Sequence, residues 1–140
     1  MDNYESFKKF ITDAGLHYAE GKLEKGDRVF RIPQQIKNGG VVDVLVVFGQ
    51  NNIKVVFLGI GKVDSDEKRN ACYKLFNDLS AQFNFFKFYV RQDGDIGLEG
   101  DVVLGIIEGE FQPKALMGFM AAAITLLQDN YGDIMKILQS

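Results

Sequence analysis

Apolar residues recur every three or four positions in two segments of the chain, residues 3–14 and 64–81. This spacing gathers them on one face and predicts two amphipathic helices. Gly15 follows the first segment and suits a helix end, since glycine readily adopts the left-handed conformation found there. Asp64 is expected to cap the second helix, with Glu67 three residues later completing a pair like a capping box.

A third helix is predicted from Pro113, since proline is tolerated in the first turn of a helix. Residues 115–127 are apolar almost all round, and residues 131–139 continue the pattern, with Gly132 as a possible kink. One sheet covers only one face of such a helix, so the other face is expected to meet a helix, a second subunit or a partner. Flexible or amphipathic side chains are enriched at such contacts. The candidate contact residues of this type are Met117, Phe119, Met120 and Tyr131.

Strand patterns fill the region between the first two helices. Residues 28–32 alternate charged and apolar, and Pro33 suggests an edge position because proline cannot donate to a ladder. Seven of the eight residues in 41–48 are apolar, which predicts a central strand covered on much of both faces. Residues 53–58 are expected to pair with it antiparallel. The weakly patterned stretch 16–26 is interpreted as a loop with a short strand.

A hairpin is predicted at Asp93-Gly94. A two-residue loop pairs positions whose numbers sum to 187, whereas a three-residue loop gives 186. The second register is favoured because it sets Lys87 opposite Glu99 and Arg91 opposite Asp95, and places Gly94 at the left-handed position of the turn. The same register is expected to bury Phe86, Phe88, Val90, Ile96, Leu98 and Val102.

The predicted order is α-β-β-β-α-β-β-α, an α+β fold with a largely antiparallel sheet packed against helices, in a single domain over residues 1–140. Lys plus Arg is 16 and Asp plus Glu is 19, so the basic surplus of a dedicated nucleic-acid binder is missing. The longest apolar stretch has 13 residues, against roughly 20 needed to cross a bilayer. With no secretory signal at its start, the chain is expected to be cytoplasmic and to bind no membrane.

Candidate chemistry is sparse. The single Cys72 and the single His17 are not brought together by any pattern, and a zinc site needs three or four such ligands. The glycines around Ile60 lack the spacing of a phosphate loop. We therefore predict no catalytic residue, no cofactor site and no metal site.

Residues 93–110 contain six acids and no Lys or Arg. They do not match a calcium loop, because Leu104 stands where that loop needs glutamate. The simplest interpretation is a solvated face. The alternative is a docking face for a basic partner.

Several of these segments resemble a known family. They are the strand pair ending at residues 53–58, the helix DEKRNACYKLFNDLSAQF, the strand FKFYV, the acidic strand DIGLEGDVV and the closing LLQDNYGDIMKIL. Together they resemble the YbjN-like family of bacterial sensory transduction regulators, which has the type III secretion chaperone-like fold. The chain departs from the family at Gly132, where members often carry proline after the terminal tyrosine. The resemblance implies a non-enzymatic, often dimeric protein, and secretion chaperones of this fold bind extended segments of client proteins.

The leading hypothesis is a protein-binding or chaperone-like regulatory module, forming a homodimer. The alternative is a small-ligand sensor or regulatory domain with a Phe-lined pocket. An enzyme ranks last, since it requires a cleft with perturbed carboxylates.

Overall fold

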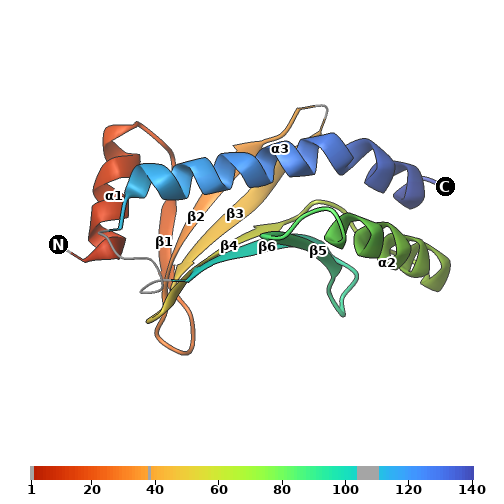
Figure 1. Cartoon of the computed structure of the whole chain (residues 1–140), viewed down its shortest axis with the longest axis horizontal. Coiled ribbons are helices and arrows are strands. Elements are labelled where there is room, and N and C mark those ends of the chain that lie inside the picture. The colour runs from red at the N-terminus through yellow and green to blue at the C-terminus, as the bar shows by residue number, and fades with distance from the viewer. Residues whose placement is uncertain (1, 38, 104–110) are drawn as a thin grey trace.

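The computed structural model describes residues 2–37, 39–103 and 111–140, which form three helices and six strands (Figure 1). In chain order the elements are α1 (Asn3–Asp13), β1 (Ala19–Lys22), β2 (Arg28–Gln35), β3 (Val41–Phe48), β4 (Asn52–Leu58), α2 (Asp66–Ser80), β5 (Phe86–Val90), β6 (Ile96–Val103) and α3 (Pro113–Leu138). The predicted α+β class is confirmed. The short strand expected within residues 16–26 is β1, so four strands precede α2.

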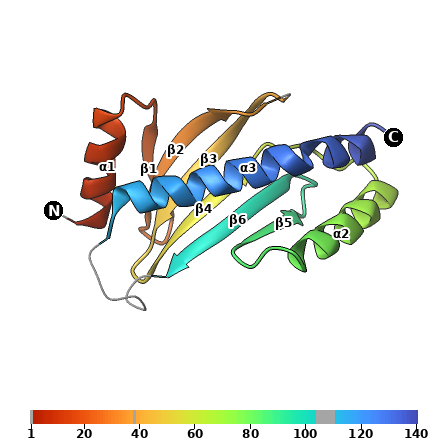
Figure 2. The same cartoon turned by 45° about the horizontal axis from the view of Figure 1, so that its top comes forward.

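The six strands form one antiparallel sheet in the order β1-β2-β3-β4-β6-β5. The last hairpin therefore folds back, so that β6 pairs with β4 and β5 lies at the edge. All three helices pack on the same face, and Figure 2 shows α3 running across it. Ring contacts mark this face: Tyr4 of α1 stacks on Phe30, Phe76 of α2 stacks on Phe88, and Phe119 of α3 meets Phe86.

Burial alternates along the central strands. On β4 the residues Ile53, Val55 and Phe57 are fully buried, while the residues between them are only half-buried. On β3 the valines at 42, 44 and 46 face the helices, whereas Val41 is 58% exposed. The prediction of a strand covered on much of both faces was therefore wrong, because the three helices all lie on one side. The opposite side is an open sheet face.

The predicted hairpin register is confirmed. Lys87 lies opposite Glu99 and Phe88 opposite Leu98, and the amide of Arg91 donates to the carbonyl of Asp95 at 2.8 Å. Gly94 has φ +90°. Of the six side chains expected inside, Phe88, Ile96 and Leu98 are buried, and Phe86, Val90 and Val102 are half-buried.

Pro33 lies within β2, which pairs on both sides and is not the outermost strand. However, β1 pairs with β2 only as far as Arg31, so at Pro33 the strand has a neighbour on the β3 side alone, where it lies opposite Asp43. Beyond Arg31, β2 is itself the outermost strand of the sheet. The proline is accommodated because no donor is required of it there.

The start of α2 differs from the prediction by one residue. Ser65, in an extended conformation with φ −152°, caps the helix by accepting a hydrogen bond from the Lys68 amide at 3.2 Å. Asp64, which is exposed, instead forms an ion pair with the half-buried Lys68 side chain, also at 3.2 Å. Both residues are good caps, so sequence preference alone did not separate them.

The closing helix α3 is continuous across Gly132. Ile134, two residues beyond the glycine, is fully buried in the core. The final carbonyl of the helix, that of Leu138, accepts a hydrogen bond from the Lys68 side chain at 2.8 Å. These contacts hold the last turns against the rest of the domain and outweigh the modest helix penalty of one glycine.

Candidate functional site

The structure disperses the four predicted contact residues of α3. Met120 is 3% exposed and belongs to the core, while Met117, Phe119 and Tyr131 are half-buried. Phe119 packs on Phe86, with ring centroids 4.6 Å apart. Their role in binding a partner stays a prediction.

The outward positions of α3 carry small side chains. Among its exposed residues are Ala115, Gly118, Ala122 and Thr125. The large residues, such as Leu126 and Leu127, face the sheet. The helix is thus apolar all round in sequence without presenting large apolar side chains all round to solvent.

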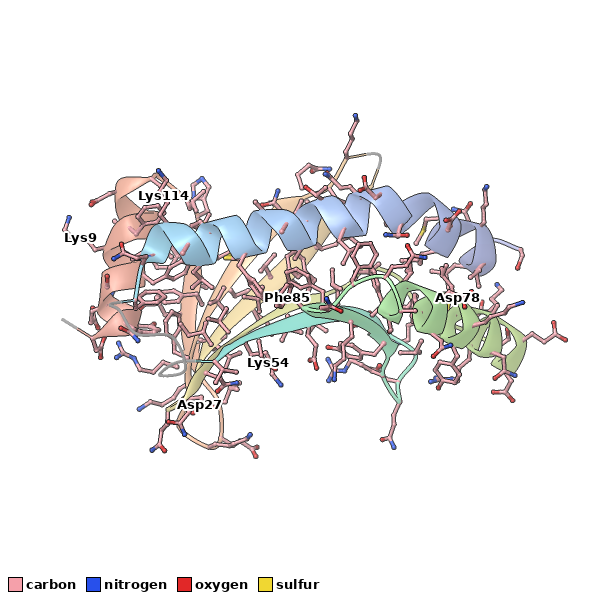
Figure 3. The ribbon with its side chains drawn as sticks, in the orientation of Figure 1. Lys9, Asp27, Lys54, Asp78, Phe85 and Lys114 are labelled. Atoms are coloured by element: carbon pink, nitrogen blue, oxygen red, sulfur yellow. The ribbon has the colours of Figure 1, made fainter. Side chains whose placement is uncertain are left out.

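A second apolar surface comes from a segment that the sequence patterns did not single out. Phe85 is 73% exposed and Phe83 is 37% exposed, and both lie in the connection between α2 and β5. Phe86 is next in the chain and contacts Phe119. We call these four residues the aromatic corner. Figure 3 shows Phe85 beneath the middle of α3 in that view.

The backbone under the aromatic corner is closely packed. A Cβ at Gly100 would lie 2.8 Å from the Phe85 carbonyl oxygen and 2.7 Å from the Phe86 ring. Only glycine allows this approach, so the base of the corner is well fixed while the Phe85 side chain is free. The signal available in the sequence was the density of phenylalanine, three in the four residues 83–86.

The open sheet face has an apolar middle with charged residues around it. Leu45, Val47, Val56 and Leu58 are half-buried there, and no helix of the described residues lies above them. Three ion pairs surround them: Arg31 with Asp43 at 2.9 Å, Lys54 with Asp101 at 4.0 Å, and Lys87 with Glu99 at 3.1 Å. Lys54 points away from the helices in Figure 3.

Tyr89, on the edge strand β5, also lies on the open sheet face. A Cβ at Gly97, the cross-strand partner of Tyr89, would lie 2.5 Å from the tyrosine ring, so the ring covers this glycine. Burial, and then the negative charge of Glu99, raise the pKa of Tyr89 to about 12. The phenol is therefore neutral at physiological pH.

Polar contacts join α1 to the first two strands. The Tyr4 hydroxyl donates to Glu20 at 2.6 Å, and the Arg28 guanidinium lies 3.5 Å from the centre of the Tyr4 ring. Arg28 also donates to Glu5 at 2.7 Å. Burial, and then the hydrogen bond to Glu20, raise the pKa of Tyr4 to about 12, and that hydrogen bond lowers the pKa of Glu20. This network joins α1 to β1 and β2 and so supports the fold.

Cys72 and His17 lie on separate parts of the fold. Cys72 is fully buried on α2, and burial raises the pKa of its thiol. His17 is exposed between α1 and β1. Within residues 2–37, 39–103 and 111–140, no three metal-ligating side chains are grouped to hold an ion, and no charged residue is buried.

The acidic run of residues 93–110 is only partly described, since Glu108 and Glu110 lie outside the described residues. Asp93 accepts the amide of Asp95 in the hairpin turn. Glu99 and Asp101 are both in ion pairs on the open sheet face.

A polar pocket of about 490 Å³ lies between the turn after β2 and the C-terminal part of α3. It is lined by Lys37, Gln128, Asp129, Tyr131, Gly132, Met135 and Gln139. No phenylalanine is among these residues, and Phe7, Phe30 and Phe57 are fully buried in the core. The pocket therefore differs in composition from the Phe-lined one expected of a ligand sensor.

None of the helices in the described ranges is both long enough and apolar enough to cross a membrane.

Comparisons with known proteins identify relatives of the chain. No curated protein sequence is similar enough to count as a match. The crystal structure of YbjN from E. coli, a protein described as a putative transcription regulator, matches with a TM-score of 0.66 at 10% identity. The match covers 94% of this chain and 93% of that one, so the two share a fold. The family model for YbjN, "Putative bacterial sensory transduction regulator", matches residues 4–134. The chain therefore belongs to the YbjN family.

Proposed function

We propose that this YbjN-family protein is a non-enzymatic regulatory module of the bacterial cytoplasm that binds another protein through its aromatic corner. The exposure of Phe85 is the observation that carries the proposal. A phenylalanine side chain gains roughly 1.5–3 kcal/mol when it is buried, so a 73% exposed ring leaves much of that free energy available to a partner.

The surroundings of Phe85 support this role. Phe83 adds further exposed aromatic surface, and the Phe86–Phe119 contact holds the neighbouring backbone in place. Aromatic anchors on a fixed base lose little conformational entropy on binding. Phe119, one of the residues predicted to meet a partner, belongs to the same surface.

The test is affinity capture from the native host, followed by titration calorimetry with each purified partner. Phe85→Ser is expected to weaken binding by tenfold or more, about 1.4 kcal/mol. Leu23→Ser is the matched control, because Leu23 is a 41% exposed apolar residue in the turn between β1 and β2. Equal affinity of wild type and Phe85→Ser for every captured protein would exclude the aromatic corner as the binding surface.

Ligand sensing is the second candidate function, and the pocket beside Tyr131 favours it. Its volume of about 490 Å³ is in the usual range of small-molecule sites, and it combines amide, carboxylate, amine and phenol groups. A thermal-shift screen of metabolites against wild type and Met135→Trp, whose larger side chain should narrow the pocket, tests this. A stabilising metabolite whose effect Met135→Trp abolishes would support it, and no shift across a broad library would count against it.

A further inference from the structure

The open sheet face is self-complementary. One cross-strand row runs over it through Ala19, Arg31, Leu45, Val56, Glu99 and Lys87. The middle of this row, and of the six-stranded sheet, falls between Leu45 and Val56. On one side of this middle, Leu45 is followed by Arg31. On the other side, Val56 is followed by Glu99, so each side has an aliphatic residue and then a charged one, and the two charges are opposite in sign.

This order matches what a two-fold interface requires. In such an interface, residue i meets residue j and residue j meets residue i. An axis parallel to the strands, between Leu45 and Val56, places Leu45 against Val56 of a second copy. The same axis places Arg31 against Glu99 of that copy, twice in the interface.

The neighbouring rows are compatible with the same axis. In the row through Val29, Val47, Lys54 and Asp101, the axis sets Val47 against Lys54, whose aliphatic stem offers an apolar contact. The outer residues of this row, Val29 and Asp101, also come opposite each other. In the row on the other side, Asp43 comes opposite Leu58. No two like charges face each other, which is the main electrostatic condition for association of identical faces.

The size of the face limits the strength of the contact. Six strands at 4.8 Å spacing, overlapping over about 20 Å, give about 600 Å² on each copy and about 1,200 Å² in total. This is the lower limit for a standard stable interface. A rapidly exchanging dimer with a dissociation constant in the micromolar range is therefore expected.

We infer that the open sheet face binds a second copy of this chain, forming a two-fold sandwich with the strands of the two sheets aligned. Phe86 and Phe119 of the aromatic corner lie on the helix side of the sheet, because their rings pack together, and Phe85 lies beneath α3 in the view of Figure 3. Self-association through the open face therefore leaves the corner available and is independent of the function proposed above.

The first test is sedimentation velocity from about 1 µM to about 1 mM protein. Arg31→Glu and Glu99→Arg are each expected to raise the dimer dissociation constant by about tenfold or more, and the double variant to restore it to within about threefold. Lys9→Glu makes the same charge change on α1, where Lys9 pairs with Asp13 of the same helix, and should leave the constant unchanged. Circular dichroism confirms that each variant is folded.

The second test locates the axis. An equimolar mixture of Leu45→Cys and Val56→Cys proteins should form the mixed disulfide faster than either protein forms its own, and buried Cys72 should not react. A monomer at every concentration would overturn the inference, as would a dimer that Arg31→Glu does not weaken or a disulfide pattern without preference for the mixed pair. None of these outcomes bears on Phe85, so the proposed function is judged separately.

Discussion

At the scale of single residues, Tyr4 shows how one side chain joins three elements. Its ring stacks on Phe30 at 4.2 Å, its hydroxyl donates to Glu20, and Arg28 lies over its other face. The sequence pattern predicted that Tyr4 lies on the buried stripe of the first helix. The pattern did not predict the polar contacts, because Glu20 and Arg28 reach Tyr4 only after β1 and β2 pair.

Tyr4 is expected to make stability depend on alkaline pH. Its pKa is about 12 in the folded protein, against 10.0 ordinarily, so between these values unfolding releases a proton and the free energy of unfolding falls as pH rises. One such proton corresponds to about 1.4 kcal/mol per pH unit. Urea unfolding at a series of pH values from 9 to 11.5 gives the free energy of unfolding as a function of pH. In Tyr4→Phe this free energy should fall less steeply with pH, by the amount that corresponds to about one proton, whereas the contribution of Tyr89 is the same in both proteins. An identical slope would contradict the assignment.

At the scale of elements, residues close together in the sequence predicted the structure correctly where they favoured one register or one cap over the alternatives. The β5–β6 register followed from two charge pairs and one turn glycine, all of them neighbours across a single hairpin. The start of α2 was ambiguous because Asp64 and Ser65 are both good caps. Which of them caps depends on the direction from which the chain enters the helix, and the preceding strand–loop path sets that direction.

Substitutions at these two positions separate the cap from its neighbour. Ser65→Ala is expected to lower the free energy of unfolding by about 1 kcal/mol, because it removes the acceptor for the Lys68 amide. Asp64→Ala should cost less than about 0.5 kcal/mol, because the Asp64 carboxylate is exposed to water and Lys68 keeps its hydrogen bond to the Leu138 carbonyl. Urea denaturation of both variants measures the difference, and the reverse ranking would mean that Asp64 is the cap.

At the scale of the whole molecule, a cluster of aromatic rings unites one end of the sheet with the helices. Phe30 is fully buried and contacts the rings of Tyr4, Phe7, Tyr18 and Phe48. Phe48 in turn meets Phe111, just before α3. Residues more than eighty positions apart therefore share one packed group.

Removing the centre of this cluster should be costly. Phe30→Ala is expected to lower the free energy of unfolding by about 3–5 kcal/mol, out of a total that is typically about 5–15 kcal/mol for such a domain. Phe85→Ala, the same change at an exposed ring, should cost less than about 0.5 kcal/mol. Thermal and urea unfolding of the pair provide the measurement. A similar loss in both variants would show that Phe85 supports the fold and is not a free binding side chain.

The sequence by itself determined the α+β class, the helix stripes and the hairpin register, since each depends on residues close in the chain. Only the tertiary structure decided that all three helices cover one face, that the valine-rich strand β3 is open on the other, and that Phe85 stays outside the core. Residues 41–48 carry apolar side chains toward both faces, and their composition does not say where the helices will lie. Phe85 is exposed for a comparable reason. The tight approach over Gly100 places the ring of Phe86 against α3 and leaves Phe85, its neighbour in the chain, in solvent.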